Sequence, residues 1–303
     1  MSAPIDLSQL PAPAVIETID FETILASRKA AVLELLPVEL RGAVATMLSL
    51  ESEPATKLLE ENSYREMILR TRINDAARAL MLAYAVGTDL DHIGANSNVE
   101  RLVVTPADPN AVPPVTKVME DDDAYRLRIQ EAPDGLSVAG PQSSYEFHAR
   151  SADGRVKDAS ATSPLPAMVV ITILSAVGDG IADSELLDIV YKALSAEEIR
   201  PIGDRLIVQV AQIIDYQIEA TLYIGKGPES SIITAAAKSR AAIASKPRRP
   251  LKYSIYRSAL NAALHVEGVR HVELTSPATN LLLDATQAAR CTAIRIAVKV
   301  DDD

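Results

Sequence analysis

Two stretches in the second half of the chain follow the same order of predicted elements: a helix, a short turn, a strand and then Thr-Ser-Pro. One is SSYEFHARSADGRVKDASATSP, which ends at Pro164, and the other is YRSALNAALHVEGVRHVELTSP, which ends at Pro277. With the two prolines aligned, the apolar positions coincide: Val156 with Val269, Ala159 with Val272, and Ala161 with Leu274. A repeat constrains architecture more than any single motif, because it requires two similar folding units. We therefore predict two related α+β units in the C-terminal half.

Each repeat leads into a stretch rich in β-forming residues. AMVVITILS (167–175) follows the first copy almost directly, and CTAIRIAVKV (291–300) follows the second after an insertion. Between them, residues 184–199 have the apolar spacing of an amphipathic helix, and residues 205–224 alternate as a strand does. Asp215 falls near the middle of this alternating run. The run therefore predicts either two strands or one bent strand.

Helical periodicity dominates the N-terminal half. Asp20 is placed to cap a helix that Pro37 ends, and a shorter helix follows. Pro54 is predicted to occupy a first helical position, which suits proline, and the next helix breaker is Gly87. This spacing predicts one long helix of roughly 30 residues.

One stripe of the long helix has residues at spacings of three and four, and it mixes apolar with polar side chains. Two interpretations are open: the stripe packs inside a self-contained bundle, or it packs against helices of another chain. Polar residues in a helical seam cost stability but can fix register and partner choice. We therefore predict a partner interface made of Leu58, Asn62, Arg65, Leu69, Ile73, Ala76, Leu80 and Tyr84.

The predicted fold class is α+β and multidomain, with an N-terminal helical region followed by the two related units. Prolines in the first residues indicate an extended arm that is either disordered or laid on a partner. The EDDD run at 120–123 is placed to cap a helix, since carboxylates suit a helix N-terminus. The predicted segments are an arm (1–19), a helical domain (20–100), a proline-rich linker (101–123), a first α+β unit (124–227) and a second α+β unit (228–303).

Composition narrows the classes of function. The net charge of −11 argues against nonspecific binding to nucleic acid, because phosphate contacts need Lys and Arg. The single cysteine, Cys291, excludes an intramolecular disulfide and is typical of a reducing compartment. No stretch is typical of a signal peptide, and no apolar run approaches the roughly 20 residues needed to span a bilayer. We expect a soluble protein.

The stretch DLDHIGANSNVE (89–100) partly matches a calcium-binding EF-hand loop. Asp89, Asp91 and Gly94 stand at matching positions, but Ile93 replaces an oxygen ligand. A proline-rich stretch follows Glu100, where an EF-hand has its second helix. We predict a short helix packed through its apolar residues, and no calcium site.

No group of catalytic residues can be assembled from the sequence. None of the four histidines stands in a close ligand pair such as HExxH, and Cys291 opens an apolar strand, which favours a core position over a nucleophile. GKGPESS (225–231) lacks the spacing of a phosphate-binding loop and predicts a strand-to-helix turn. The basic segment KPRRP (246–250) is predicted to cap a helix or meet an acidic neighbour. We predict no catalytic, cofactor-binding or metal-binding residue; the histidines are His92, His148, His265 and His271.

Taken together, the order of these features resembles the baseplate assembly protein J family of contractile-tailed bacteriophages and tail-derived bacteriocins. The resemblance covers nearly the whole chain. It is carried by IDLSQLPAP, by LLPVELRGAVATMLSLESEPATKLLEENSYREMILRTRINDAARALMLAYAVGTDLDHIGA, by GLSVAGPQSSYEFHARSADGRVKDASATSP, by AEEIRPIGDRLIVQVAQIIDYQIEATLYI and by GVRHVELTSP.

The resemblance implies a structural subunit of the baseplate wedge, without enzymatic activity or cofactor. Such subunits assemble with a smaller wedge protein, two copies to one partner, through N-terminal helices gathered in a bundle. Their C-terminal regions pair with neighbouring copies to close a ring around the central hub, near the sheath end of the tail. The implied location is the virion tail baseplate, with synthesis and assembly in the bacterial host cytoplasm, and no membrane or nucleic acid is implied as a partner.

Two other functions stay open at this point. A tail-associated hydrolase or processing enzyme would use residues such as His148, His265 or Cys291. A DNA-contacting tail component would use Arg248 and Arg249, and its binding would be sensitive to salt.

Overall fold

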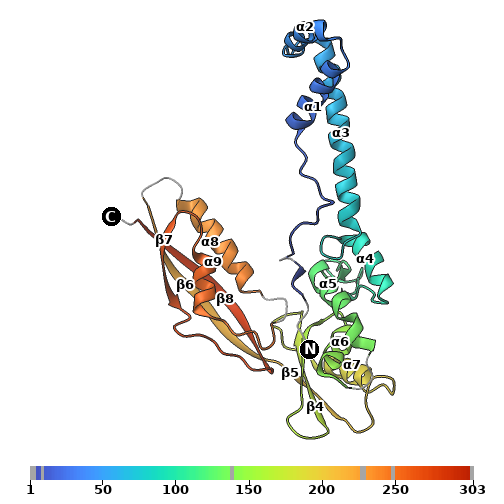
Figure 1. Ribbon diagram of the computed structural model, residues 1–303. Helices are drawn as coiled ribbons and strands as arrows, with labels where there is room; N and C mark the ends of the chain where they lie inside the picture. Colours follow the sequence, from blue (N-terminus) through green and yellow to red (C-terminus); the bar gives the residue numbers. More distant parts are fainter. Residues whose placement is uncertain (1–4, 8–9, 137–139, 226–229, 247–249, 301–303) are drawn as a thin grey trace. The chain divides into compact units, whose positions relative to one another are not determined.

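A computed structural model describes residues 5–7, 10–136, 140–225, 230–246 and 250–300 (Figure 1). The chain separates into two compact units, Met1–Asn96 and Ser97–Asp303. The first unit is helical and the second contains the sheets, so the α+β fold class is confirmed. The finer division into five segments stays a prediction.

The helical unit contains α1 (Phe21–Glu34), α2 (Val38–Leu48), α3 (Pro54–Ala79) and α4 (Gly87–Asn96). Asp20 caps α1 as predicted, because its Oδ2 accepts a hydrogen bond from the Thr23 amide at 2.8 Å. Pro37 separates α1 from α2, and Pro54 occupies the first turn of α3. Figure 1 shows α1 running alongside α3, against which it packs.

Helix α3 is shorter than the sequence predicts. It ends at Ala79, and Leu80 is its C-cap. The following amides bond to carbonyls three residues back, Met81 to Arg78 at 3.0 Å and Tyr84 to Met81 at 2.9 Å. Such tightened turns end an α-helix without proline or glycine. The predicted end at Gly87, which rests on a helix breaker, is therefore too late in the sequence. Gly87 therefore begins α4 instead of ending the long helix.

The N-terminal arm contacts α3 of its own chain. The Glu17 amide donates to Oδ1 of Asn74 at 3.1 Å, and the Asn74 side-chain amide donates to the Glu17 carbonyl at 2.9 Å. The Glu17 carboxylate also pairs with Arg70 at 2.9 Å. The backbone of Glu17 is therefore held by a buried asparagine of the same chain, and for the rest of the arm both alternatives, disorder or a partner chain, stay predictions.

Replacing Asn74 by alanine is expected to release the arm. Asn74 is 6% exposed, and the change leaves the Glu17 amide and carbonyl without these bonds, at a cost of about 1–2 kcal/mol. Hydrogen exchange should rise at residues 13–19 while α3 stays protected. Asn62→Ala is the matched control, because the Asn62 side chain bonds to the Leu58 carbonyl of its own helix and not to the arm as described. An arm that exchanges equally slowly in both variants contradicts the prediction.

The second unit begins with a small antiparallel pair, β1 (Val103–Thr105) and β2 (Val118–Met119). Helix α5 (Asp122–Glu131) follows, and Asp121 caps it by accepting from the Ala124 amide at 2.8 Å. This confirms that the acidic run caps a helix. A 3₁₀ turn (Ala132–Leu136) then leads towards the first α+β sheet.

The first sheet has the strand order β3-β4-β5. Strand β3 (Val156–Thr162) pairs antiparallel with β4 (Met168–Ser175), and β5 (Arg205–Val210) pairs parallel with β4. Helices α6 (Gln142–Ala152) and α7 (Ser184–Leu194) pack against this sheet and against each other. Their buried contacts with the strands form one core: Tyr145, Ala149, Val156, Ala159, Ala161, Ile171, Ile173, Ala182, Leu186, Val190, Leu194 and Leu206.

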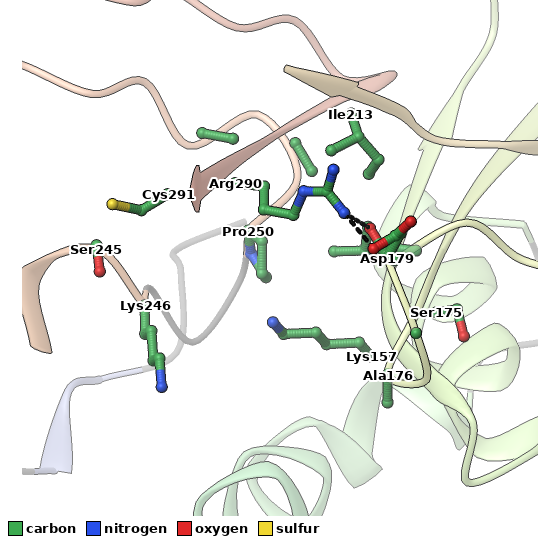
Figure 2. Close-up of a pocket in the computed structure, with 15 residues that line it drawn as sticks. Lys157, Ser175, Ala176, Asp179, Ile213, Ser245, Lys246, Pro250, Arg290 and Cys291 are labelled. Atoms are coloured by element: carbon green, nitrogen blue, oxygen red, sulfur yellow. Dashed lines mark hydrogen bonds and ion pairs between the residues drawn. The ribbon is translucent and has the colours of Figure 1, made fainter. Parts of the chain in front are cut away.

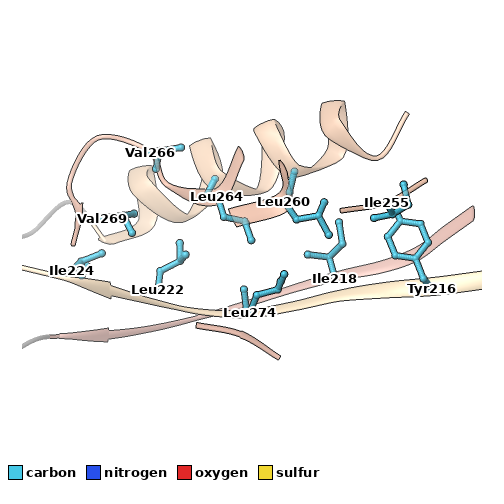
Figure 3. Close-up of a cluster of buried hydrophobic side chains, with 13 residues drawn as sticks. Tyr216, Ile218, Leu222, Ile224, Ile255, Leu260, Leu264, Val266, Val269 and Leu274 are labelled. Carbon is cyan, nitrogen blue, oxygen red and sulfur yellow. The ribbon is translucent and has the colours of Figure 1, made fainter. Parts of the chain in front are cut away.

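The second sheet has the order β7-β6-β8. Strand β6 (Gln212–Ile224) pairs antiparallel with β7 (Val269–Ser276) and parallel with β8 (Gln287–Val300). Helices α8 (Ser230–Ala244) and α9 (Arg257–Leu264) cover one face. Alternate β6 side chains point at these helices, as period-two alternation requires. Figure 3 shows this core, with Ile218 and Leu222 of β6 beneath Leu260 and Leu264 of α9.

The predicted repeat is present locally but not in the pairing of strands. The pairs α6–β3 and α9–β7 confirm the helix-turn-strand order, and Val156 and Val269 are both buried. However, β4 pairs with the strand before it, whereas β8 pairs with β6 at the opposite edge from β7. The alternating run 205–224 forms two strands, but they divide at Ala211 and not near Asp215.

Candidate partner interface

The predicted interface stripe lies on the exposed side of α3. Leu58 and Leu69 are each 66% exposed, Ile73 is 56% exposed and Leu80 is 83% exposed. Asn62, Arg65 and Ala76 are also exposed. These seven side chains lie on one surface of the helix. Tyr84 lies beyond the end of α3 and is half-buried. Whether a partner binds here stays a prediction.

Helix α1 uses a different face of α3. Ile24 and Leu25 of α1 are buried, as are Ser63 and Asn74 of α3. Residues 63 and 74 lie roughly a third of a turn around the helix from Leu58, Leu69 and Leu80. The buried side chains of α3 are therefore small or polar, whereas the larger apolar stripe faces outward.

Both polar members of the stripe are held by their own helix. The Asn62 side-chain amide donates to the Leu58 carbonyl at 2.9 Å. The Arg65 guanidinium is paired with Glu61 one turn earlier. These local bonds orient the two side chains along the helix surface, where they interrupt an otherwise apolar seam.

Exposed apolar residues extend beyond the predicted stripe. Tyr64 is 54% exposed and Ile68 is 50% exposed, on the side of α3 next to Arg65. Leu35 and Val38, at the turn between α1 and α2, are 86% and 73% exposed. The predicted stripe does not include these residues, although Tyr64 and Ile68 stand at the i,i+4 spacing of helix neighbours. Large exposed apolar side chains that lie together on one helix face are candidates for an interaction site.

An ionic chain ties α1, α3 and the arm together. Arg28 of α1 bonds to Glu66, which also accepts from Arg70 at 2.7 Å, and Arg70 reaches Glu17. Hydrogen bonds from Arg70 and then Arg28 hold the pKa of the Glu66 carboxyl below its ordinary value. These groups are on the surface, so they orient the elements more than they stabilise them.

The calcium-like stretch is helical over most of its length. Residues 87–96 form α4, in which Leu90 is fully buried, as the prediction of a short packed helix requires. An EF-hand loop would need an open ring of oxygens over the same residues. Across the part of the chain that the structure describes, no group of three or more His, Cys, Asp or Glu residues is arranged to hold a metal ion.

The residues that an enzyme would use belong to different elements, among them His148 on α6, His271 on β7 and Cys291 on β8. His92, His265 and His271 are exposed, and the His271 ring lies 5.6 Å from that of Tyr223. Burial lowers the pKa of His148, on α6, which favours its neutral form. Burial raises the pKa of the Cys291 thiol, on β8, and a protonated thiol is a poor nucleophile. The structure does not bring these side chains together.

The second unit buries several charged side chains, which the sequence analysis did not single out. Arg128 of α5 pairs with Glu120 at 2.7 Å, and both are 9% exposed or less. Arg150 of α6 bonds to Glu131 of α5 and lies 3.6 Å from Asp158 of β3, and each of these three side chains is 5% exposed or less. No periodicity predicts such pairs, because their members come from different elements.

Two further features bear on partners. None of the helices described is both long enough and apolar enough to cross a lipid bilayer. In the basic segment 246–250, residues 247–249 lie outside the described residues, so the predicted role of this segment is not tested.

Most of the chain matches one known family. Models of three parts of one family match it: the baseplate J-like N-terminal domain over residues 51–108, the central domain over 137–210 and the C-terminal domain over 216–297. The chain is also 54% identical to baseplate protein J of Escherichia phage P2 over 299 residues, which are 99% of this chain and 99% of that protein. It is therefore a structural component of a bacteriophage tail baseplate and belongs to the baseplate J-like family.

Proposed function

We propose that the chain is a subunit of the baseplate wedge, which joins the sheath-and-tube end of a contractile tail to its periphery. It assembles with a smaller wedge protein, two copies to one partner. Neighbouring copies then form a ring around the central hub. The role is mechanical, without a catalytic step or a cofactor, and assembly takes place in the cytoplasm of the bacterial host.

The observation that carries this proposal is the exposed apolar stripe of α3. Four large aliphatic side chains, Leu58, Leu69, Ile73 and Leu80, are each more than half exposed. A partner that covers them would gain roughly 25 cal/mol of binding free energy for each Å² of apolar surface removed from water. A helix with such a face is suited to packing into an inter-chain bundle, with Asn62 and Arg65 setting the register.

The test is the mass of the complex formed when the chain is co-expressed with the smaller wedge protein. Native mass spectrometry is expected to give two copies of this chain for each partner. The chain lacking residues 1–86 should give no complex, because the stripe residues are absent, while its two α+β units keep their circular dichroism. A complex of unchanged mass and yield from the shortened chain would show that the helical unit is not the site of assembly.

A further inference from the structure

The two α+β sheets are joined through a single residue. Strand β5 ends at Val210 and β6 begins at Gln212, with Ala211 between them. The Ala211 amide donates to the Ile173 carbonyl in the first sheet at 2.9 Å, whereas the Gln212 amide donates to the Thr286 carbonyl, next to β8 of the second sheet, also at 2.9 Å. The central and C-terminal family domains likewise meet between residues 210 and 216. The chain therefore changes sheets at Ala211.

The apolar contact at this junction is small. It consists of four buried residues, with Ile213 packed against them. Each sheet has its own larger core, and the two cores share no member. Two bodies with separate cores and a narrow connection are arranged as in hinge motions. The four residues are Leu174, Ala211, Leu251 and Ala288.

A buried carboxylate connects the two bodies across the junction. Asp158, on β3 of the first sheet, is 1% exposed. Its Oδ2 accepts from the Leu251 amide at 3.0 Å, and Leu251 bridges to Ala288 of β8 in the second sheet. Its Oδ1 accepts from the Ala159 amide at 2.9 Å and lies 3.6 Å from Nη1 of Arg150. Because the carboxylate is held by its own body, the Leu251 amide is fixed to the first sheet.

A second contact across the junction is more exposed. Arg290 of β8 pairs with Asp179, in the turn after β4, at 2.6 Å, and with Asp215 of β6 at 2.7 Å. Figure 2 shows the Arg290 guanidinium reaching Asp179 beside Pro250 and Lys157. The Arg290 side chain is 37% exposed. Water screens such a pair, so it fixes the junction less firmly than the buried carboxylate does.

We propose that Ala211 is a hinge between the two α+β units, and that the hydrogen bond from the Leu251 amide to Asp158 fixes its angle. Without that bond, the small apolar cluster and the screened Arg290 pair are the contacts described above that still hold the junction. Opening the hinge breaks these two contacts and leaves both cores intact. This inference goes beyond the proposed wedge function and does not depend on it.

The test measures the distance between spin labels on the two bodies of the full chain. The labels are placed at the exposed positions Lys192→Cys on α7 and Lys238→Cys on α8, with Cys291→Ser removing the native thiol. The parent chain is expected to give one narrow distance distribution. In Asp158→Ala its width should rise at least about two-fold, since the bond that fixes the angle is lost. Asp158→Asn, which keeps one acceptor oxygen, should give an intermediate width.

The matched control is Asp153→Ala. The Asp153 carboxylate is less buried than that of Asp158, and it bonds to Arg155 within its own body, so the distance distribution should not change. Hydrogen exchange of β4 and β6 reports whether each core is intact. An unchanged width in both Asp158 variants overturns the proposal. So does a loss of protection in β4 in both variants, because Asp158 would then support a core and not the junction.

Discussion

Replacing Leu69 by aspartate is expected to weaken binding of the smaller wedge protein by more than about 100-fold, which is roughly 3 kcal/mol. Leu69 is at the middle of the exposed stripe of α3 and is 66% exposed. A partner helix that covers the stripe would enclose the new carboxylate. The nearest cation of the stripe, Arg65 one turn earlier, is already paired with Glu61. A buried charge without a free counter-charge is among the most destabilising changes in an interface.

The same substitution should leave the separate chain folded. In the absence of a partner the side chain faces water, where substitutions usually change the free energy of unfolding by less than about 0.5 kcal/mol. Co-purification with the tagged partner measures binding, and the thermal transition of the chain alone measures folding. Together they separate a lost interface from a lost fold.

Thr71→Asp is the matched control. Thr71 is exposed on the same helix, two residues along, and therefore on nearly the opposite side from Leu69. It introduces the same charge into α3 without entering the stripe, so the partner should co-purify at the yield of the unchanged chain. If Leu69→Asp co-purifies equally well, the chains meet elsewhere, and the C-terminal units must carry the assembly.

The helical unit shows what periodicity can and cannot predict. The start of α1 at Asp20 and the stripe on α3 follow from local rules, since capping and the 3.6-residue period depend on neighbouring residues. The end of α3 does not, because no proline or glycine marks Ala79. The docking of Glu17 on Asn74 also joins residues far apart in the sequence, and the pattern of either segment alone leaves that contact undetermined.

In the sheets, too, local patterns were predictable from the sequence and long-range contacts were not. Alternation predicted the strands, and the repeat predicted the similarity of α6–β3 to α9–β7. Which strands pair depends on long-range contacts, so the sequence did not reveal that β8 pairs with β6. The buried charges were missed because Glu131, Arg150 and Asp158 come from three different elements. Each has the local pattern of an ordinary surface residue until the fold brings them together.

Replacing Arg150 by methionine is expected to lower the free energy of unfolding of the second unit by about 3–5 kcal/mol. The change keeps most of the side-chain volume and removes the charge. Glu131 and Asp158, which are 4% and 1% exposed, then lose the guanidinium that faces both of them. Urea unfolding followed by tyrosine fluorescence measures the effect, since Tyr125 and Tyr145 are buried in the same unit.

Arg155→Met tests whether the effect comes from burial. Arg155 also faces carboxylates, those of Asp153 and Glu185, but its side chain is 24% exposed and Glu185 is 74% exposed. Water can replace part of what the guanidinium provides there, so the loss should be under about 1 kcal/mol. Equal losses in the two variants would mean that the charge of Arg150 matters no more than that of a surface arginine.

The double variant Arg150→Met with Glu131→Gln separates the cost of an unpaired charge from the value of the ion pair. Glu131→Gln removes the carboxylate that Arg150 contacts directly, so in the double variant the methionine no longer takes a guanidinium away from that charge. The double variant should therefore be more stable than the sum of the two single losses predicts, by about 1 kcal/mol or more. Strict additivity would show that Arg150 and Glu131 act independently despite their contact. In that case the stabilisation by Arg150 would come from its contact with Asp158. The Asp158 carboxylate also accepts the hydrogen bond of the Leu251 amide at the junction of the two sheets.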